Sequence, residues 1–251
     1  MTLTILSILP DLLNVNGDAE NARVLAQRAS WSEIGARIVT HATVRPDLVV
    51  IGSGIDAVLG VLASALVAQA DSLRGWLSDG TAILAVGTGF ELLSEGVQLS
   101  PEEWLTGIAI FPGRSVHAAT RVSDDLVVSS RFGRLVGYEN HARDFLLAAD
   151  ADAGAGDAGA LGTVLYGRGN GPDGRAEGAA QGTAFGTHLH GPVLAKNPAF
   201  ADHLLAIAAG HAYSASNERA ARVDEIARAA RNQIAMRLNL GTEAQLPGQE
   251  R

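Results

Sequence analysis

The sequence predicts an α/β fold in which helices flank a mostly parallel sheet, with a small antiparallel extension. Three observations lead to this class. Apolar runs alternate with longer amphipathic stretches, several runs end in glycine-rich turns, and hydrophobic residues make up 47% of the chain. Strands and helices that alternate through short turns are typical of parallel sheets covered on both faces. Ligands of such folds bind at the carboxyl ends of the strands.

The first half of the chain supplies the parallel strands of this prediction. Apolar runs predict strands at residues 3–9, 36–40, 47–51 and 82–86. Amphipathic stretches between them predict helices at residues 18–31, 55–70 and 90–95. Glycine-rich turns at 52–54 and 87–89 follow the third and fourth strands, because glycine lets the backbone reverse sharply.

The second half of the chain has shorter apolar runs and predicts the antiparallel pieces. We expect strands at residues 107–111, 118–122, 126–129, 135–138, 163–166 and 184–190, and helices at 197–211 and 216–238. Two glycine-rich segments, 148–162 and 167–182, are typical of loops. We expect residues 1–240 to form one domain and residues 241–251 to form a tail.

Composition excludes several kinds of partner and site. The net charge is −8 and the pI is about 5.3, so the chain has no general attraction for nucleic acid. The longest uncharged apolar run, 57–70, is too short for a membrane span, and the N-terminus lacks the basic start of a signal peptide. We therefore expect a cytoplasmic protein without membrane insertion. The absence of cysteine excludes disulfides, thiolate metal sites and a cysteine nucleophile.

The strand, turn and helix around Gly87 form the first candidate site. The segment LAVGTGFELL at residues 84–93 matches a sharp turn that lifts one residue above the sheet. The next amide, that of Thr88, would point at a bound group. An ordinary glycine-rich loop is the alternative interpretation.

Two histidines close the last predicted strand. His188 and His190 are spaced i, i+2, so their side chains would lie on one face of a strand. Either could act as a general base near neutral pH. A metal site is the weaker hypothesis, since the chain has no cysteine and no third ligand at motif spacing. A surface histidine or a hydrogen-bonded core histidine remains the alternative.

Two further stretches could bind a polar ligand. Tyr138, Glu139 and His141 could line such a site, although a solvated turn is the alternative. The segment IGSGID at residues 51–56 partly fits a dinucleotide fingerprint, but no acidic residue follows at the expected distance. The same turn, including Gly54, could instead supply backbone amides to an oxyanion.

Together these stretches resemble one protein family. Residues 9–21 (LPDLLNVNGDAEN), 137–141 (GYENH), 167–178 (GRGNGPDGRAEG) and 186–198 (GTHLHGPVLAKNP) are similar to motifs of class I glutamine amidotransferases, which have a flavodoxin-like fold. The resemblance covers about residues 5–210. It points to the cobyric-acid-synthase-like branch, and within it most to the glutaminase subunit of lipid II isoglutaminyl synthase.

The resemblance implies a function and roles for particular residues. Family members hydrolyse L-glutamine with an elbow cysteine, for which His190 would be the base. Oxyanion donors would come from Gly54 and the Thr88 amide, and Tyr138 would contact the substrate. Arg121 would hold glutamine or pass ammonia, with a surface ion pair as the alternative. No cofactor or metal is implied. The partner would be a Mur-like ATP-dependent ligase, in a heterodimer that amidates D-glutamate of the lipid II stem peptide.

Four departures from the family pattern qualify this resemblance. Gly87 stands where the family has its cysteine, and the other changes are Thr88 for Gly or Ala, Glu91 for Gln, and His188 for Tyr. Without a thiol no acyl-enzyme forms, so the resemblance implies a chain inactive as a glutaminase. Several changes together favour natural loss over a single engineered substitution.

Several functions stay open from the sequence. The chain could be a glutaminase subunit that lost its nucleophile, a non-catalytic structural or regulatory partner, or a protein of cobalamin-type pathways. Thr88 acting as a nucleophile is a minor alternative, because threonine is poorly reactive without a well-placed base. If the remaining site is intact, a cysteine placed at position 87 should react with a glutamine-mimicking electrophile. The assignment to this family depends on the Gly87 turn and the His190 imidazole facing each other across a pocket able to hold an amide side chain.

Overall fold

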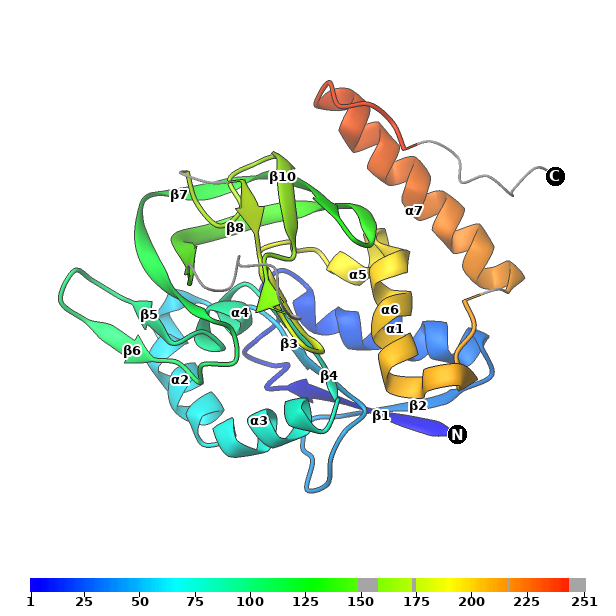
Figure 1. The fold of residues 1–251 in the computed structure, drawn as a ribbon, viewed down its shortest axis with the longest axis horizontal. Helices are drawn as coiled ribbons and strands as arrows, with labels where there is room; N and C mark the ends of the chain where they lie inside the picture. Colours follow the sequence, from blue (N-terminus) through cyan, green and yellow to red (C-terminus); the bar gives the residue numbers. More distant parts are fainter. Residues whose placement is uncertain (149–157, 173–174, 216, 244–251) are drawn as a thin grey trace.

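The computed structural model describes residues 1–148, 158–172, 175–215 and 217–243. Two sheets form its framework, one of seven strands and one of six within these ranges. Figure 1 shows the second sheet, with β7, β8 and β10, above the helices and strands of the first. The fold class is therefore confirmed as α/β.

The seven-stranded sheet is parallel over its first five strands. Its order is β2-β1-β3-β4-β13-β12-β9, and β12 and β9 are antiparallel to their neighbours. The bounds are β1 Thr2–Ile8, β2 Gly35–Val39, β3 Leu48–Ile51, β4 Ala82–Val86, β9 Ala158–Gly159, β12 Ala179–Gln181 and β13 Ala184–Thr187. The carboxyl ends of β1, β3, β4 and β13 therefore meet at one edge, where ligands are expected.

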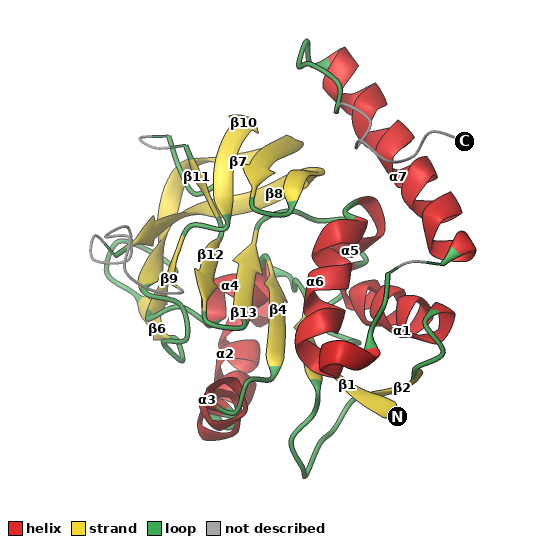
Figure 2. Ribbon diagram, turned by 45° about the vertical axis from the view of Figure 1, so that its right-hand side comes forward, coloured by secondary structure: helices red, strands yellow, loops and turns green. Residues whose placement is uncertain are grey.

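Helices cover both faces of this sheet, as Figure 2 shows. One face carries α1 Asn21–Trp31, α5 Val193–Lys196 and α6 Pro198–Ala209; the other carries α2 Leu59–Val67, α3 Ala70–Ser78 and α4 Thr88–Leu92. Short 3-10 helices lie at η1 Asp18–Glu20, η2 Asp56–Val58 and η4 Gly210–Ala212. The long helix α7 Glu218–Arg237 lies outside α5 and α6.

The core consists of two layers, one on each side of the sheet. Along β3, Leu48 and Val50 face the layer of α1 and α6, whereas Val49 and Ile51 face the layer of α2 and α4. All four side chains are buried. Burial on both faces explains why these strands appear in the sequence as continuous apolar runs.

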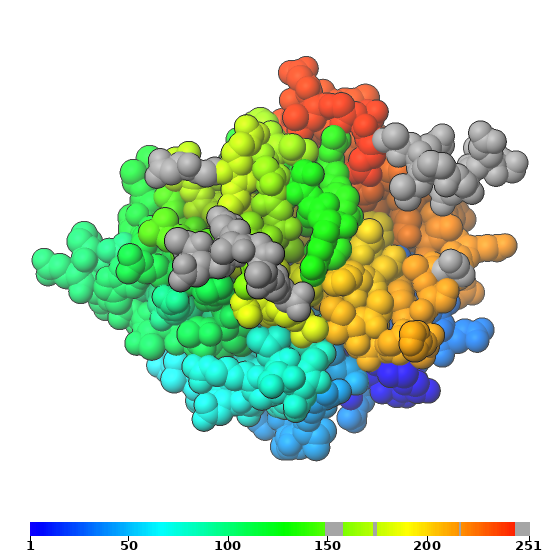
Figure 3. All heavy atoms as spheres, viewed as in Figure 1, coloured from blue at the N-terminus to red at the C-terminus, as the bar shows by residue number. Residues whose placement is uncertain are grey.

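The second sheet is built around one long hairpin. Strands β7 Gly113–Ser130 and β8 Gly133–Leu147 pair antiparallel along most of their length. The other strands are β5 Gly96–Gln98, β6 Trp104–Thr106, β10 Gly162–Tyr166 and β11 Ala176–Glu177. In the space-filling view the green and yellow-green residues of this sheet lie above the cyan residues of α2 and α3 (Figure 3).

Some predicted elements were wrong in extent or kind. The antiparallel part belongs to a six-stranded, mainly antiparallel sheet rather than a small extension, and the runs 118–122 and 126–129 belong to the single strand β7. Segment 107–111 is not a strand, because its amides donate to the α4–β5 region, as in Ile108 N to Leu92 O. The predicted strand 184–190 ends at Thr187.

The predicted helices also differ from the observed ones in their limits. Helix 55–70 is divided into η2, α2 and α3, the last of which continues to Ser78. Helix α4 begins at Thr88, two residues before the predicted start, and α5 was not predicted. The predicted loop at 148–162 lies mostly outside the described residues, and the predicted tail lies outside them from residue 244.

Membrane-spanning potential is limited to one bent pair within the described ranges. No single helix there is long and apolar enough to cross a bilayer. The pair Asp56–Val67 and Ala70–Ser78 reaches the required length and composition only when its two parts, bent by 60°, are combined. Leu62, Leu66 and Leu73 of this pair are fully buried in the protein core.

Candidate functional site

The turn after β4 has the sharp conformation that the sequence predicts. Gly87 lies at φ 54° and ψ −119°, a backbone region that residues with a side chain rarely adopt. Its amide donates to Thr187 O of the neighbouring strand at 2.9 Å, and its carbonyl accepts from Glu91 N, in α4, at 2.9 Å. Strand and helix therefore hold the turn from both sides.

Gly87 faces His190 across this turn. A β-carbon on residue 87 would lie 2.6 Å from His190 Cε1 and 2.7 Å from Ser53 Oγ. The backbone of His190 is fixed by its amide, which donates to Tyr138 O at 2.8 Å. The structure thus brings together the two positions on which the sequence-based hypothesis depends, although their roles stay proposals.

His190 is held in one orientation by an acidic side chain. Its Nδ1 lies 2.9 Å from Asp18 Oδ2, and both side chains are fully buried. A carboxylate oxygen accepts, so Nδ1 carries the proton and Nε2 keeps its lone pair. Within the described residues, Nε2 has no hydrogen-bond partner. This arrangement is that of a general base with a second group behind it.

A cavity of about 150 Å³ opens beside Gly87, but His190 is not among the residues that line it. Its lining includes Gly87 together with three of the predicted site residues: Gly54, Thr88 and Arg121. The cavity lies past the carboxyl ends of β3 and β4, at the edge where the fold class predicts a ligand. Its volume suits a small polar molecule rather than a nucleotide.

Arg121 lies at the cavity rim and is half-exposed. Its Nε donates to Asn140 Oδ1 at 3.0 Å, and its Nη1 lies 4.0 Å from Asp56 Oδ2. An exposed contact of that length contributes little stability. The Arg121 guanidinium therefore has N–H donors left for a ligand. A surface ion pair, the alternative interpretation, describes only its long contact with Asp56.

A buried ion network forms another wall of the cavity. Arg143 Nε donates to Glu91 Oε2 at 2.8 Å, and Arg143 Nη2 donates to Asp56 Oδ1 at 2.5 Å. Burial alone would lower the pKa of Arg143, but the charges of Glu91 and Asp56 outweigh it and raise the pKa. Glu91 is thus an acidic side chain paired with an arginine, in a position where the resemblance expects glutamine.

Tyr138 contacts His190 rather than the cavity. Its ring centroid lies 5.6 Å from that of His190, and the two residues form an isolated antiparallel bridge. Burial, followed by the charge of Asp18, raises the pKa of Tyr138. Tyr138 does not line the cavity, and its contact with substrate stays a prediction.

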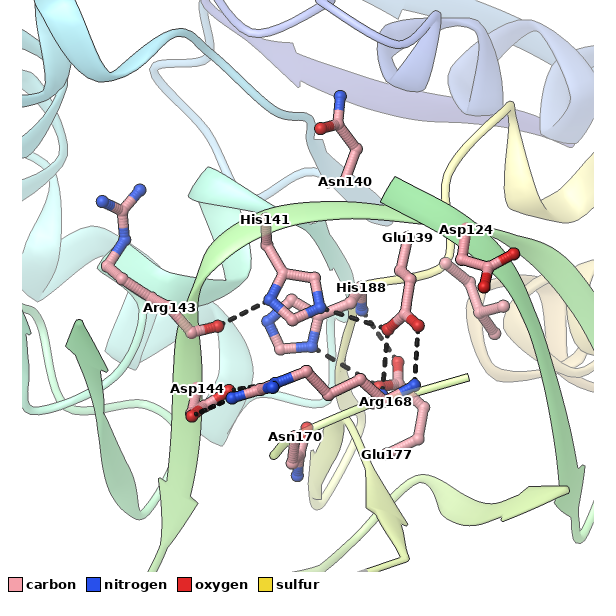
Figure 4. Close-up of polar contacts among 12 residues, drawn as sticks. Asp124, Glu139, Asn140, His141, Arg143, Asp144, Arg168, Asn170, Glu177 and His188 are labelled. Atoms are coloured by element: carbon pink, nitrogen blue, oxygen red, sulfur yellow. Dashed lines mark hydrogen bonds and ion pairs between the residues drawn. The ribbon is translucent and has the colours of Figure 1, made fainter. Parts of the chain in front are cut away.

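His188 and His190 do not share a strand face as predicted. The strand ends before both, and the His188 ring stacks on His141 with centroids 4.2 Å apart. His188 Nδ1 lies 3.4 Å from Glu177 Oε2, and His141 Nε2 lies 3.2 Å from Glu139 Oε2 (Figure 4).

The two histidines and two glutamates just named form a second cluster, which holds a loop against the two sheets. Glu139 also accepts from the amides of Arg168 and Gly169, and Arg168 pairs with Asp144 at 2.7 Å (Figure 4). Of these residues, His141 also lines the cavity. Within the described ranges, no group of three or more His, Asp or Glu residues is arranged to hold a metal ion.

Sequence reasoning missed three residues that shape the site. Asp18 is the partner of His190, Arg143 lies in the ion network, and Ser53 faces Gly87. Asp18 was visible only as part of the GDAEN motif. Ser53 lies in the glycine-rich turn 52–54, for which the sequence suggested a role only for the backbone amides. No signal in the sequence distinguished Arg143 from a surface arginine.

Comparison with known proteins agrees with this geometry. The family model described as the CobB/CobQ-like glutamine amidotransferase domain matches residues 4–198. The chain belongs to this family. The amidotransferase-like turn, histidine and cavity all lie within the matched residues, which confirms the resemblance found in the motifs.

Two curated relatives and one solved structure illustrate the relationship. Subunit GatD of lipid II isoglutaminyl synthase (glutamine-hydrolyzing) from Staphylococcus aureus is 30% identical over 81% of this chain and 83% of its own length. Its counterpart from Streptococcus pneumoniae is 25% identical over 82% and 80%. A crystal structure titled glutamine amidotransferase matches with a TM-score of 0.53 and 16% identity, over 82% of this chain and 98% of that chain.

Proposed function

We propose that this amidotransferase-like chain is the glutaminase-type subunit of an enzyme of the lipid II isoglutaminyl synthase kind, and that it binds L-glutamine without hydrolysing it. Its partner is a Mur-like ATP-dependent ligase that amidates D-glutamate of the lipid II stem peptide. The relatives named above support the pathway, and the cavity supports retention of the amide site. Nitrogen for the ligase then comes from free ammonia.

One observation carries the proposal. Gly87 occupies the turn opposite His190, and the chain contains no cysteine. Amide hydrolysis in this family begins with attack of a thiolate on the amide carbon, with the histidine then protonating the ammonia that leaves. His190 and its Asp18 partner supply the second function, but no atom on residue 87 supplies the first.

The charges around the cavity suit an amino acid. Arg121 offers guanidinium donors for a carboxylate, and the half-exposed Asp56 offers oxygens for an ammonium group. The Thr88 amide next to Gly87 already donates to Ser53 Oγ at 3.3 Å, so the side-chain amide of glutamine would lie beside this hydrogen bond without replacing it. We infer from these positions that glutamine lies with its side-chain amide towards Gly87.

A second candidate is a purely structural or regulatory partner of the ligase. The Arg143, Glu91 and Asp56 side chains satisfy one another inside the cavity, so this wall of the site is stable without a ligand. Under this alternative, the chain stabilises the ligase but has no affinity for glutamine. A cytoplasmic location and the absence of nucleic acid partners stay predictions from composition.

The pathway is tested by reconstituting the chain with a Mur-like ligase from the same genome. We expect the two to co-elute, and we expect lipid II to be amidated with ammonium chloride but not with glutamine as the nitrogen source. The His190→Gln variant should leave the ammonium-dependent reaction unchanged. Failure to co-elute, or amidation from glutamine that depends on His190, would contradict the proposal.

A further inference from the structure

Ser53 occupies the space opposite Gly87, and no role has been given to its side chain. We propose that Ser53 and Gly87 form a matched pair, in which the Ser53 side chain fills the nucleophile's space and blocks the Thr88 amide. Restoring a cysteine at position 87 is then not sufficient to restore reactivity. This inference uses the proposed function in one respect only, namely that the amide bound at the site is that of glutamine.

The steric evidence is the position that a side chain on residue 87 would take. Its β-carbon would lie 2.7 Å from Ser53 Oγ and 2.9 Å from Ser53 Cβ. Contacts under 3.0 Å between such atoms are repulsive, so one of the two residues has to move. Ser53 is buried, with 5% of its surface exposed, and it lines the cavity.

Hydrogen bonds hold the Ser53 hydroxyl where it is. Thr88 N donates to Ser53 Oγ at 3.3 Å, and Ser53 Oγ lies 3.3 Å from Thr88 Oγ1. Because Thr88 Oγ1 donates its own proton to Gly54 O at 3.0 Å, the Ser53 hydroxyl is the donor in its contact with Thr88 Oγ1.

This direction of donation argues against Ser53 as a replacement nucleophile. A serine nucleophile gives its proton to the base, yet the Ser53 proton points to Thr88 Oγ1. His190 Nε2 has no hydrogen-bond partner within the described part of the chain. Ser53 therefore fills the site instead of reacting in it.

The same contact blocks the oxyanion position. The Thr88 amide directly follows residue 87 and is a candidate donor for an oxygen that would develop negative charge there. Because Ser53 Oγ already accepts from that amide, a bound amide oxygen would have to displace the hydroxyl. Two features therefore prevent hydrolysis: the thiol is missing, and the Thr88 amide is already bonded to Ser53 Oγ.

The test is a set of variants at the two positions. A glutamine analogue with a diazoketone in place of the amide would be used to label Gly87→Cys, alone and combined with Ser53→Gly. We expect the double variant to be labelled at least about tenfold faster than the single one, the factor that about 1.4 kcal/mol of relieved strain produces. His190 must adjust to the new β-carbon in both variants, so the comparison isolates residue 53.

A matched control separates the two effects of Ser53. Ser53→Ala combined with Gly87→Cys removes the hydroxyl but keeps the β-carbon that lies 2.9 Å from the new side chain. Its labelling rate should fall between those of the other two variants. Each variant is checked for its melting temperature, and its thiol is also titrated with iodoacetamide, a reagent that needs no glutamine site.

The outcomes distinguish this inference from the proposed function. Equal labelling and equal iodoacetamide rates in the single and double variants overturn the blocking role of Ser53. If iodoacetamide reacts faster with the double variant but the glutamine analogue labels neither, the pair is supported and glutamine binding is wrong. If only the double variant folds, the steric conflict is confirmed directly; if neither folds, the matched pair is rejected.

Discussion

The charges of single residues around the cavity are set by burial and by a few close partners. His190 is oriented by Asp18, and Arg143 is held between Glu91 and Asp56. Sequence motifs pointed to His190 because it lies within a motif that the family shares, residues 186–198. They could not predict the Asp18 contact, which joins residues 172 positions apart. Such pairing depends on the tertiary fold, which no local pattern encodes.

His141 makes the stability of the protein depend on pH. Burial lowers the pKa of His141, but its hydrogen bond to Glu139 and the nearby carboxylates outweigh this and raise the pKa. The imidazolium is therefore favoured in the folded state. Its contribution is fully present below the unfolded pKa of about 6.5 and is lost as pH rises through the higher folded pKa.

We expect the difference in unfolding free energy between the wild type and His141→Gln to shrink as pH rises above about 6.5. Urea unfolding at a series of pH values measures it. His117→Gln, on the exposed side of β7, is the control and should change stability by less than about 0.5 kcal/mol at each pH. A stability difference between the wild type and His141→Gln that grows with pH would contradict the raised pKa of His141.

At the scale of elements, β13 and α4 pack so closely that one position of β13 can only be glycine. A β-carbon on Gly186 would lie 2.0 Å from Phe90 Cδ2. The Phe90 ring is fixed in turn, with its centroid 5.3 Å from Phe111 and 4.4 Å from Phe145. This contact places the start of α4, and with it the Thr88 amide, against the end of β13.

Gly186→Ala should therefore destabilise the protein by at least about 2 kcal/mol, because the fixed ring cannot move away. The matched control is Gly75→Ala, in the exposed part of α3, where a β-carbon would meet nothing within 4 Å. That change should stabilise the protein by roughly 0.5–1 kcal/mol, since alanine favours helix. Equal effects of the two substitutions in urea unfolding would refute the packing argument.

The parallel strands were predictable at this scale, whereas the long hairpin was not. Strands β3 and β4 are buried on both faces and therefore appear as uninterrupted apolar runs. The middle of β7 contains the polar residues Ser123, Asp124 and Asp125, which pair with β8 through the backbone. A polar, partly exposed strand has no continuous apolar pattern, so the sequence showed β7 only as two separate runs, 118–122 and 126–129.

For the whole molecule, one arginine joins three helices. Arg28 of α1 is 3% exposed and donates to Asp202 of α6 at 2.8 Å and to Asp224 of α7 at 2.6 Å. Burial alone would lower the pKa of Arg28, but these two carboxylates raise it. Figure 1 shows α7 at the edge of the fold, where Arg28 helps to attach it together with contacts such as that of Arg231 Nη1 with Lys196 O at 2.6 Å. That residues 1–240 act as one domain stays a prediction.

Arg28→Met should lower the unfolding free energy by about 3 kcal/mol, the lower end of the range for removing one partner of a buried ion pair. The lower end applies because the Asp202 and Asp224 carboxylates keep some contact with water. Arg28→Lys keeps the charge and should cost less. Urea unfolding gives the loss of stability, and the rate of tryptic cleavage within α7 reports detachment of that helix. Unchanged cleavage in Arg28→Met would show that α7 is attached by other contacts.

The central claim for the molecule is that the site binds an amide that it cannot hydrolyse. Titration calorimetry with L-glutamine, followed by an assay for released ammonia on the same sample, tests this claim most directly. The account predicts measurable binding that Arg121→Ala weakens, with no ammonia above the spontaneous rate. Catalytic release of ammonia from glutamine by the purified chain, lost in His190→Ala, would contradict it.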